Sequence, residues 1–386
     1  MRGGRTGVAL AALSSACFTS VTSENLPVAL LPQLASGLDV PESAIGLLMT
    51  GYAVVVAVTV VPLVTATARV DRRTTALVTV AAIAVSNLLL AVAPDYRVAV
   101  VARLVSALGH GVFWSVVAAM AARLLGPDRA GRATAVVFAG NSLAFLLGLP
   151  LGSWLGATIG WRPTILAVAG VAALAAALIR VTVDPMPARR STAPMSEVRQ
   201  VVTDRSLVLV NLATVVVVTG HFAAFTYITA IIADHVGLTG SATSGLLLAH
   251  GAAGLLGLVL IGRHVDRRPR STALVVTAGL AACMVVLLVS GSPFLAGAAV
   301  VLWAVPAGGI GVVLQAAVLR ASDRPDLASA VYIVAFQVGI ALGAWVGGVF
   351  LDRGALPLAV ATAATCGLAA AIVVRRSAAF RPAPVG

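Results

Sequence analysis

The stretch Val70-Asp71-Arg72-Arg73-Thr74 lies between two long apolar runs, and it occurs again, almost unchanged, as Val265-Asp266-Arg267-Arg268-Pro269. The two aspartates are 195 positions apart, from 71 to 266, which is close to half of the 386 residues. A charged segment repeated at half the chain length indicates a duplication. The sequence therefore predicts two copies of one structural unit.

Three glycines spaced four residues apart follow the same duplication. Gly148, Gly152 and Gly156 recur at an offset of 191 as Gly339, Gly343 and Gly347. The two offsets, 195 and 191, differ by about one helical turn. Residues four apart share one face of a helix, and glycines there let a neighbouring backbone approach closely. Pro150 removes a backbone donor in the same stretch, so we expect a bend there.

Composition determines the solvent of this chain. Hydrophobic residues make up 60% of it and charged residues 10%, and the mean hydropathy is +1.03. A water-soluble protein needs a polar surface, which this composition does not supply, so we expect a lipid bilayer around it. The net charge is +12, and all 26 basic residues are Arg. Because they lie between apolar runs rather than along a basic stripe with aromatic residues, we expect no nucleic-acid partner.

A helix that crosses a bilayer needs roughly 20 mainly apolar residues. The longest polar break, 184–204, separates six such stretches from six others. We therefore predict an all-α membrane protein with twelve transmembrane helices in two pseudo-symmetric six-helix bundles, 1–183 and 205–386, joined by a linker at 184–204. The predicted spans are 8–33, 43–68, 74–93, 97–124, 131–157, 162–183, 206–234, 241–263, 271–290, 293–320, 326–350 and 355–375.

The distribution of Arg predicts the orientation, because loops on the cytoplasmic side carry an excess of basic residues. Of the 26 Arg, 22 fall on the side that holds both termini and the 184–204 linker, and three on the other side. Arg103 lies inside a span. We expect a multi-pass protein of the cell (inner) membrane with both termini in the cytoplasm.

Several motifs resemble one transporter family. Asp71-Arg72 and Gly262 to Arg270 are similar to the charged loop motif of the major facilitator transporters, although Thr67 and Thr74 replace two of its glycines. The stretch Arg103 to Trp114, with its Gly-His-Gly-Val-Phe-Trp ending, and Gly148-Leu-Pro150-Leu-Gly152 resemble the twelve-helix drug:proton antiporters, in their sugar-efflux and chloramphenicol-exporter branch. The resemblance covers essentially the whole chain.

This resemblance implies proton-coupled efflux of a small organic molecule or drug by alternating access between two halves. The helix stretch with Gly148, Pro150, Gly152 and Gly156 is the family's antiporter motif. The family also implies gating roles for Asp71, Arg72, Asp266 and Arg267. In the family, Asp71 would face the helix start near Pro325 and Asp266 the helix start near Arg132, where a carboxylate meets the positive end of a helix dipole.

Ionisable groups inside the membrane indicate the proton site. Glu24 is the acid well inside a span, about 13 Å below the outer face, and Arg103 lies about 9 Å below it. His110 follows Arg103 by seven positions, on the same helix face. We expect these three residues to couple proton movement to transport. A static buried ion pair, or a Glu24 that reaches the surface, is the alternative.

Candidate cavity residues are Trp114, Asn141, His221, Phe225 and Trp303, although aromatic side chains at these spacings also suit a packed core or a lipid-facing surface. We expect no metal, because no acid or Cys stands at ligand spacing from the histidines. No nucleophile constellation is present, so we expect no enzyme activity and no cofactor. A sugar or metabolite exporter and a proton-linked uptake carrier are the alternatives on the same fold. We expect the protein to work as a monomer with a small-molecule substrate and protons as its partners.

Overall fold

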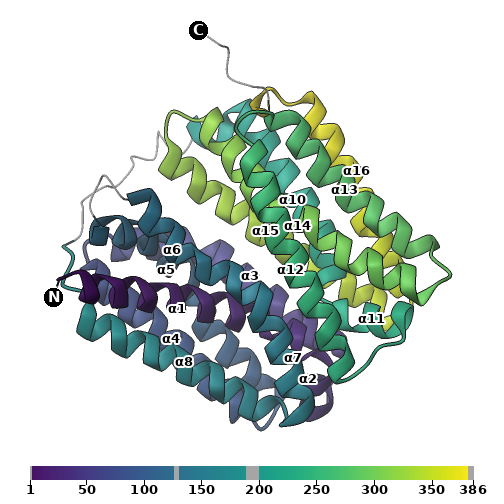
Figure 1. Ribbon diagram of the computed structural model, residues 1–386, viewed down its shortest axis with the longest axis horizontal. Coiled ribbons are helices and arrows are strands. Elements are labelled where there is room, and N and C mark those ends of the chain that lie inside the picture. Colours follow the sequence, from purple (N-terminus) through teal and green to yellow (C-terminus); the bar gives the residue numbers. More distant parts are fainter. Residues whose placement is uncertain (1, 126–129, 188–199, 381–386) are drawn as a thin grey trace. The chain divides into compact units, whose positions relative to one another are not determined.

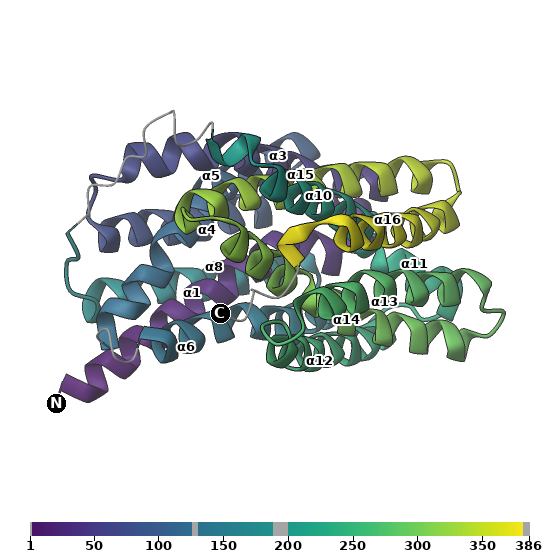
Figure 2. The same cartoon turned by 90° about the horizontal axis from the view of Figure 1, so that it is seen from above.

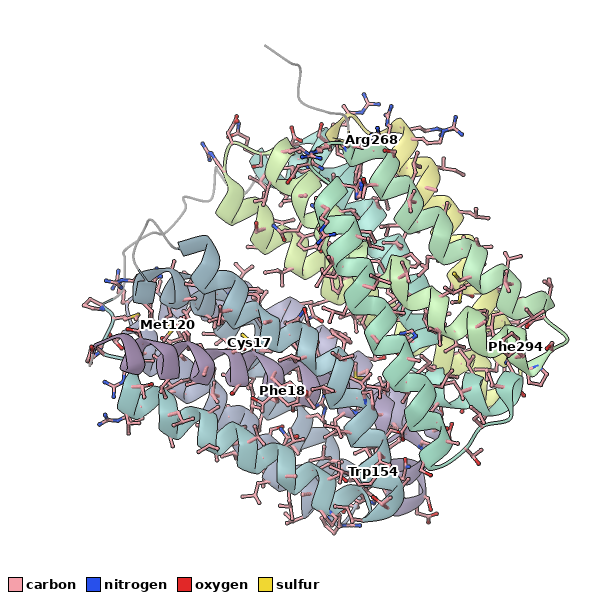
Figure 3. All side chains as sticks on the ribbon, in the orientation of Figure 1. Cys17, Phe18, Met120, Trp154, Arg268 and Phe294 are labelled. Carbon is pink, nitrogen blue, oxygen red and sulfur yellow. The ribbon has the colours of Figure 1, made fainter. Side chains whose placement is uncertain are left out.

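The computed structural model describes residues 2–125, 130–187 and 200–380, and these residues are helical almost throughout (Figure 1). Within these ranges, twelve helices are long and apolar enough to cross a membrane. The prediction of an all-helical protein with twelve spans is confirmed. Large apolar side chains such as Val289 and Phe294, 75% and 82% exposed, lie on the outside, and Figure 3 shows Phe294 at the end of its helix. Lipid is the solvent that suits such a surface.

The contacts within the chain define two compact units. One consists of Met1–Val40 and Val58–Thr192, and the other of Pro41–Ala57 and Ala193–Gly386. Helix α3 (Glu42–Thr67) therefore contributes its first part to the second unit and its last part to the first. The predicted division at 184–204 stays a prediction, and residues 188–199 of that linker lie outside the described residues.

The first unit is built around α1, which packs against α6 and α8, while α4 packs against α5 and α8 (Figure 1). Its core contains the fully buried side chains of Leu13, Cys17, Phe113, Met120 and Ile179, and Figure 3 labels Cys17 and Met120. The helices are α1 (Arg2–Ala29), α2 (Leu31–Leu38), α4 (Arg72–Ala91), α5 (Tyr96–Leu125), α6 (Ala130–Leu143), the π-helix η2 (Ala144–Gly148), α7 (Leu149–Thr158) and α8 (Trp161–Thr182).

The second unit is built around α10, which packs against α15, α16 and α14 (Figure 2). Its other close pairs are α12 with α14 and α13 with α14 and α16. The helices are α10 (Arg205–Phe225), α11 (Ile228–Val236), α12 (Ser241–His264), α13 (Pro269–Val289), α14 (Pro293–Ala321), α15 (Pro325–Asp352), α16 (Leu356–Arg376) and the short 3-10 helix η3 (Ala378–Phe380).

Three predicted spans are interrupted. The first divides into α1 and α2, and Pro32 stands in the first turn of α2, where a missing N–H does no harm. The fifth contains the π-helix η2, which ends two residues before Pro150, and the Leu149 N–H donates to the Ala144 carbonyl five residues back. Pro150 cannot donate to the carbonyl four residues before it, so the helix widens there, and the expected bend stays a prediction. The seventh divides into α10 and α11.

Candidate functional site

Arg103 is anchored to the backbone of α1. Its guanidinium, on α5, donates to the carbonyls of Ser23 at 2.6 Å and Glu24 at 2.8 Å, and the residue is 1% exposed. Pro27 explains why one of these acceptors is available, because it lacks the N–H that would bind the Ser23 carbonyl within the helix. Placing a cation at mid-membrane costs about 2.5–3.5 kcal/mol. Two hydrogen bonds to a charged group, each worth about 1.5–3 kcal/mol, offset that cost.

The Glu24 carboxylate faces His110 on α5, the helix that also carries Arg103. Its Oε2 lies 3.9 Å from Nε2 of His110, and the two side chains are 12% and 8% exposed. On the other edge of the ring, Nδ1 of His110 lies 3.4 Å from the Ser20 hydroxyl, one turn before Glu24 on α1. An imidazole between a hydroxyl and a carboxylate can take up or release a proton at either nitrogen. The structure thus brings Glu24, Arg103 and His110 together between α1 and α5.

A third helix completes this polar cluster. Asn87 of α4 donates through its amide to the Ser23 hydroxyl at 2.7 Å and to the Ile83 carbonyl at 2.8 Å. Its Oδ1 is buried and has no hydrogen-bond partner among the described residues. Sequence analysis did not single out Ser23, Pro27 or Asn87. The signal was present in Pro27, whose position four residues after Ser23 frees that carbonyl for a buried donor.

Trp114 of α5 and Asn141 of α6 are the candidate cavity residues of the first unit. The Trp114 ring is 6.2 Å from that of His110 and 5.3 Å from that of Phe138 on α6, measured between centroids. Both Trp114 and Asn141 are half-buried. Trp114 therefore connects the ring of His110 to α6, the helix that carries Asn141.

The remaining candidate cavity residues form an aromatic cluster in the second unit. His221 and Phe225 of α10 stack at 5.1 Å between centroids, and the Trp303 indole of α14 donates to Nδ1 of His221 at 3.2 Å. His250 of α12, which was not among the predicted site residues, joins them with its ring 5.3 Å from that of Trp303. Trp303 is fully buried and His221 is partly exposed. The cluster is closely packed at Trp303 and accessible at His221.

Gly148 at the end of η2 and Gly152 and Gly156 of α7 lie against α1 and the residue that follows it, all within one unit. A methyl group added at Gly148 or Gly156 would overlap Thr22 or Leu30, and one at Gly152 would lie 3.1 Å from Leu26. These partners are themselves four residues apart, so the two helices pack turn against turn. In the second unit Gly339, Gly343 and Gly347 pack in the same way against α10, at Val218, Thr219 and Ala223.

The charged repeats have local roles within each unit. Asp71 caps α4, its carboxylate accepting from the Thr74 N–H at 3.1 Å, and Asp266 lies 3.8 Å from Arg320 of α14. Arg73 donates to the Arg180 carbonyl at the end of α8, and Arg270 donates to the Arg375 carbonyl at the end of α16, at 2.7 Å. An arginine at each charged segment therefore binds the C-terminal end of the last long helix of its unit. The side chains of Arg132 and Pro325, which the resemblance places opposite the aspartates, lie outside the described residues.

Within the described residues no three His, Cys, Asp or Glu side chains are close enough together to hold a metal ion. Twelve spans in the described residues, together with a buried charged cluster, are typical of a membrane transporter. A family model described as Major Facilitator Superfamily matches residues 13–344, and the chain belongs to this superfamily. It is a multi-pass membrane protein that transports a small-molecule substrate, and it is not an enzyme. The resemblance inferred from the motifs is confirmed.

Two curated relatives and two solved structures are similar to the chain. It is 37% identical over 375 residues to a chloramphenicol efflux pump of Mycobacterium tuberculosis strain CDC 1551 / Oshkosh, covering 95% of this chain and 91% of the relative. The same identity, over 377 residues, relates it to a chloramphenicol efflux pump of strain H37Rv, with the same coverage of each chain.

A crystal structure of a peptide transporter in complex with alafosfalin matches 96% of this chain and 95% of its own, with a TM-score of 0.76 and 12% identity. An inward-facing, unoccupied bacterial homologue of the human lysosomal transporter Spinster matches 97% and 96%, with a TM-score of 0.70 and 15% identity. At these identities the two structures establish the fold alone.

Proposed function

We propose that this transporter exports a small organic molecule of the chloramphenicol type across the cytoplasmic membrane in exchange for protons. The support for this substrate class is the 37% identity to two chloramphenicol efflux pumps over nearly the whole chain. The Arg distribution supports an orientation with both termini in the cytoplasm. In this orientation the proton gradient of the cell drives export.

Glu24 carries the proton in this mechanism, and the observation that supports it is its buried position 3.9 Å from the His110 imidazole. Arg103 is held by the backbone carbonyls of Ser23 and Glu24, so its charge stays in place while the carboxylate changes partner. Protonation of Glu24 neutralises the carboxylate and weakens its attraction to His110 and Arg103. Loss of the proton restores both attractions. The protonation state thus selects between two arrangements of α1 and α5.

Substrate binds beside this cluster. Trp114 offers an aromatic face, and the unpaired Oδ1 of Asn87 accepts from a hydroxyl or amide of the substrate. The further residues that we propose as substrate contacts are Asn141, in the first unit, and His221, Phe225 and Trp303, in the second. Because the same cluster binds the proton and the substrate, occupation by one opposes occupation by the other, which is the condition for exchange.

The two units move relative to one another during transport, as alternating access requires. Asp71, Arg72, Asp266 and Arg267 stabilise the closed cytoplasmic side through contacts with helix ends, each worth about 0.3–2 kcal/mol. Interactions of this size close a gate and still allow it to open. The glycines of the antiporter motif, Gly148, Gly152 and Gly156, with Pro150, keep η2 and α7 rigidly against α1 as the unit moves. One protein chain supplies all these groups, and we propose that the monomer is the working unit.

Transport by purified protein tests this function. The protein is reconstituted into liposomes, and uptake of radiolabelled chloramphenicol is followed after a pH gradient is imposed with the lumen acidic, so that protons leave the lumen as substrate enters. Accumulation that requires the gradient is the expected result. Accumulation of a labelled sugar instead would favour the metabolite-exporter alternative, and movement of substrate in the same direction as protons would favour uptake.

A further inference from the structure

Hydrogen-bond donors and acceptors in the aromatic cluster of the second unit fix the protonation of both histidines. The Trp303 indole N–H can only donate, so Nδ1 of His221, 3.2 Å away, must carry a lone pair. The Val300 carbonyl can only accept, so Nδ1 of His250, 2.7 Å away, must carry a proton. The neutral His221 ring thus holds its proton on Nε2, whereas the neutral His250 ring holds it on Nδ1.

When the neutral rings are protonated to imidazolium, only His221 loses its hydrogen bond. A proton added to His221 enters at Nδ1 and turns the acceptor of Trp303 into a donor. Two N–H groups then face one another at the distance of a hydrogen bond, and the indole is driven away. A second proton on His250 enters at Nε2 and leaves the bond to Val300 intact.

Few other groups compete for this proton. His250 contacts Phe225 and Trp303, at ring centroid distances of 6.1 Å and 5.3 Å. From the helices packed on α10, the described side chains that ionise away from the helix ends are Tyr332 of α15 and Cys366 of α16, which lies behind Gly220. Asp234 and His235 pair with each other at the end of α11, and α14 carries no acid or base between Pro293 and Leu319. Acids that would hold a proton in place of His221 are therefore absent from this part of the described chain.

Trp303 stands where α14 bends most easily. Pro306, three residues later, lacks the N–H that would bind the Leu302 carbonyl, and Gly308 and Gly309 follow. At this level α14 meets α12 backbone to backbone, since a methyl group at Gly257 would overlap the Val305 carbonyl and one at Gly308 the Gly254 carbonyl. A displaced Trp303 therefore bends α14, and α12 must follow.

We propose that His221 is a second proton-binding site of this transporter, and that Trp303 converts its protonation into a bend of α14. The inference rests on the proposed function, because it adds a proton in the second unit to the one carried by Glu24. The partial exposure of His221, beside the fully buried Trp303, gives the proton a way in.

The first test is ¹⁹F NMR of the protein labelled with 5-fluorotryptophan, in detergent, titrated from about pH 8 to about pH 5. The Trp303 resonance is assigned by its loss in Trp303→Phe. We expect it to shift with pH, while those of Trp154 and Trp345, 48% and 51% exposed on the outside, stay in place. His221→Asn keeps an acceptor at the position of Nδ1 and should abolish the shift, and the matched control His250→Asn should retain it. A Trp303 signal that ignores pH in the parent, or a shift that survives His221→Asn, would overturn the proposal.

The second test is accumulation in liposomes at a fixed pH gradient with the membrane potential clamped. Each proton exchanged per substrate contributes about tenfold to the limiting accumulation per pH unit, so His221→Asn should lower it about tenfold per unit. If the parent responds to the gradient and His221→Asn accumulates equally, the second site is refuted and the proposed function stands. If the parent ignores the gradient, the proposed function fails, and the NMR titration alone decides whether His221 takes a proton.

Discussion

Pro27 and Arg103 should be energetically coupled, although they never exchange a hydrogen bond. In the parent, Pro27 leaves the Ser23 carbonyl without a helical donor, and Arg103 supplies one at 2.6 Å. Arg103→Met removes that donor and leaves a buried carbonyl unpaired, which costs about 1–3 kcal/mol. In Pro27→Ala the new N–H at position 27 binds the Ser23 carbonyl within α1, so the same Arg103→Met substitution should no longer carry this cost.

The expected result is a double-mutant cycle in which the double variant is more stable than the sum of the single variants by about 1–3 kcal/mol. The free energy of unfolding is measured for the four proteins by titration with a denaturing detergent in mixed micelles. Pro62 of α3 provides the matched control, since it is also a proline inside a spanning helix. The cycle of Pro62→Ala with Arg103→Met should be additive within about 0.5 kcal/mol. Additivity in the Pro27 cycle as well would show that Pro27 does not create the Arg103 site.

Further predictions concern packing, gating and orientation. Gly140→Ala should lower the thermal unfolding midpoint in detergent, because the methyl group would overlap the backbone of α1, whereas Gly170→Ala, with no atom within 4 Å, should not; equal midpoints would contradict the close α1–α6 contact. Asp71→Asn should keep the α4 cap, so the free energy of unfolding should change by less than about 0.5 kcal/mol. The same variant should transport severalfold more slowly, because it removes the gate charge. A transport rate equal to that of the parent would show that Asp71 serves only as a helix cap. Single cysteines at Ser191 and Asp39 should react with an impermeant reagent from opposite sides of the membrane, and labelling of Ser191 on intact cells would reverse the orientation.

The transmembrane spans and the depths of the charged residues in the membrane could be predicted, because both depend only on position along the chain. The rise of a helix per residue is fixed, so Glu24 and Arg103 could be assigned to similar depths without a structure. Which atoms meet depends on helix rotation, which spacing alone does not set. The capture of Arg103 by the Ser23 carbonyl and the link from Ser23 to Asn87 therefore appeared only in the structure.

The sequence predicts which residues pack against a neighbour more readily than it predicts which helix that neighbour is. The glycine spacing of α7 identified a packing face, but any neighbouring helix would have satisfied it, and the structure assigns that face to α1. His250 was not among the predicted site residues, because its place beside Trp303 depends on the packing of α12 against α14. The break between α10 and α11 contains no proline, so the sequence carries no signal for it. There Tyr227 donates to the Ala344 carbonyl at 2.9 Å, a contact between segments distant in sequence.

The most direct test of proton coupling is transport by Glu24→Gln in liposomes, compared with the parent under two conditions. Glutamine nearly keeps the size and hydrogen bonding of the side chain but cannot titrate. Without a pH gradient, exchange of labelled for unlabelled substrate should continue at a rate close to that of the parent. With an imposed gradient, Glu24→Gln should accumulate about tenfold less substrate per pH unit than the parent, because the proton of Glu24 is no longer exchanged. Accumulation by Glu24→Gln equal to that of the parent would contradict proton transfer at Glu24 and assign the proton to another group.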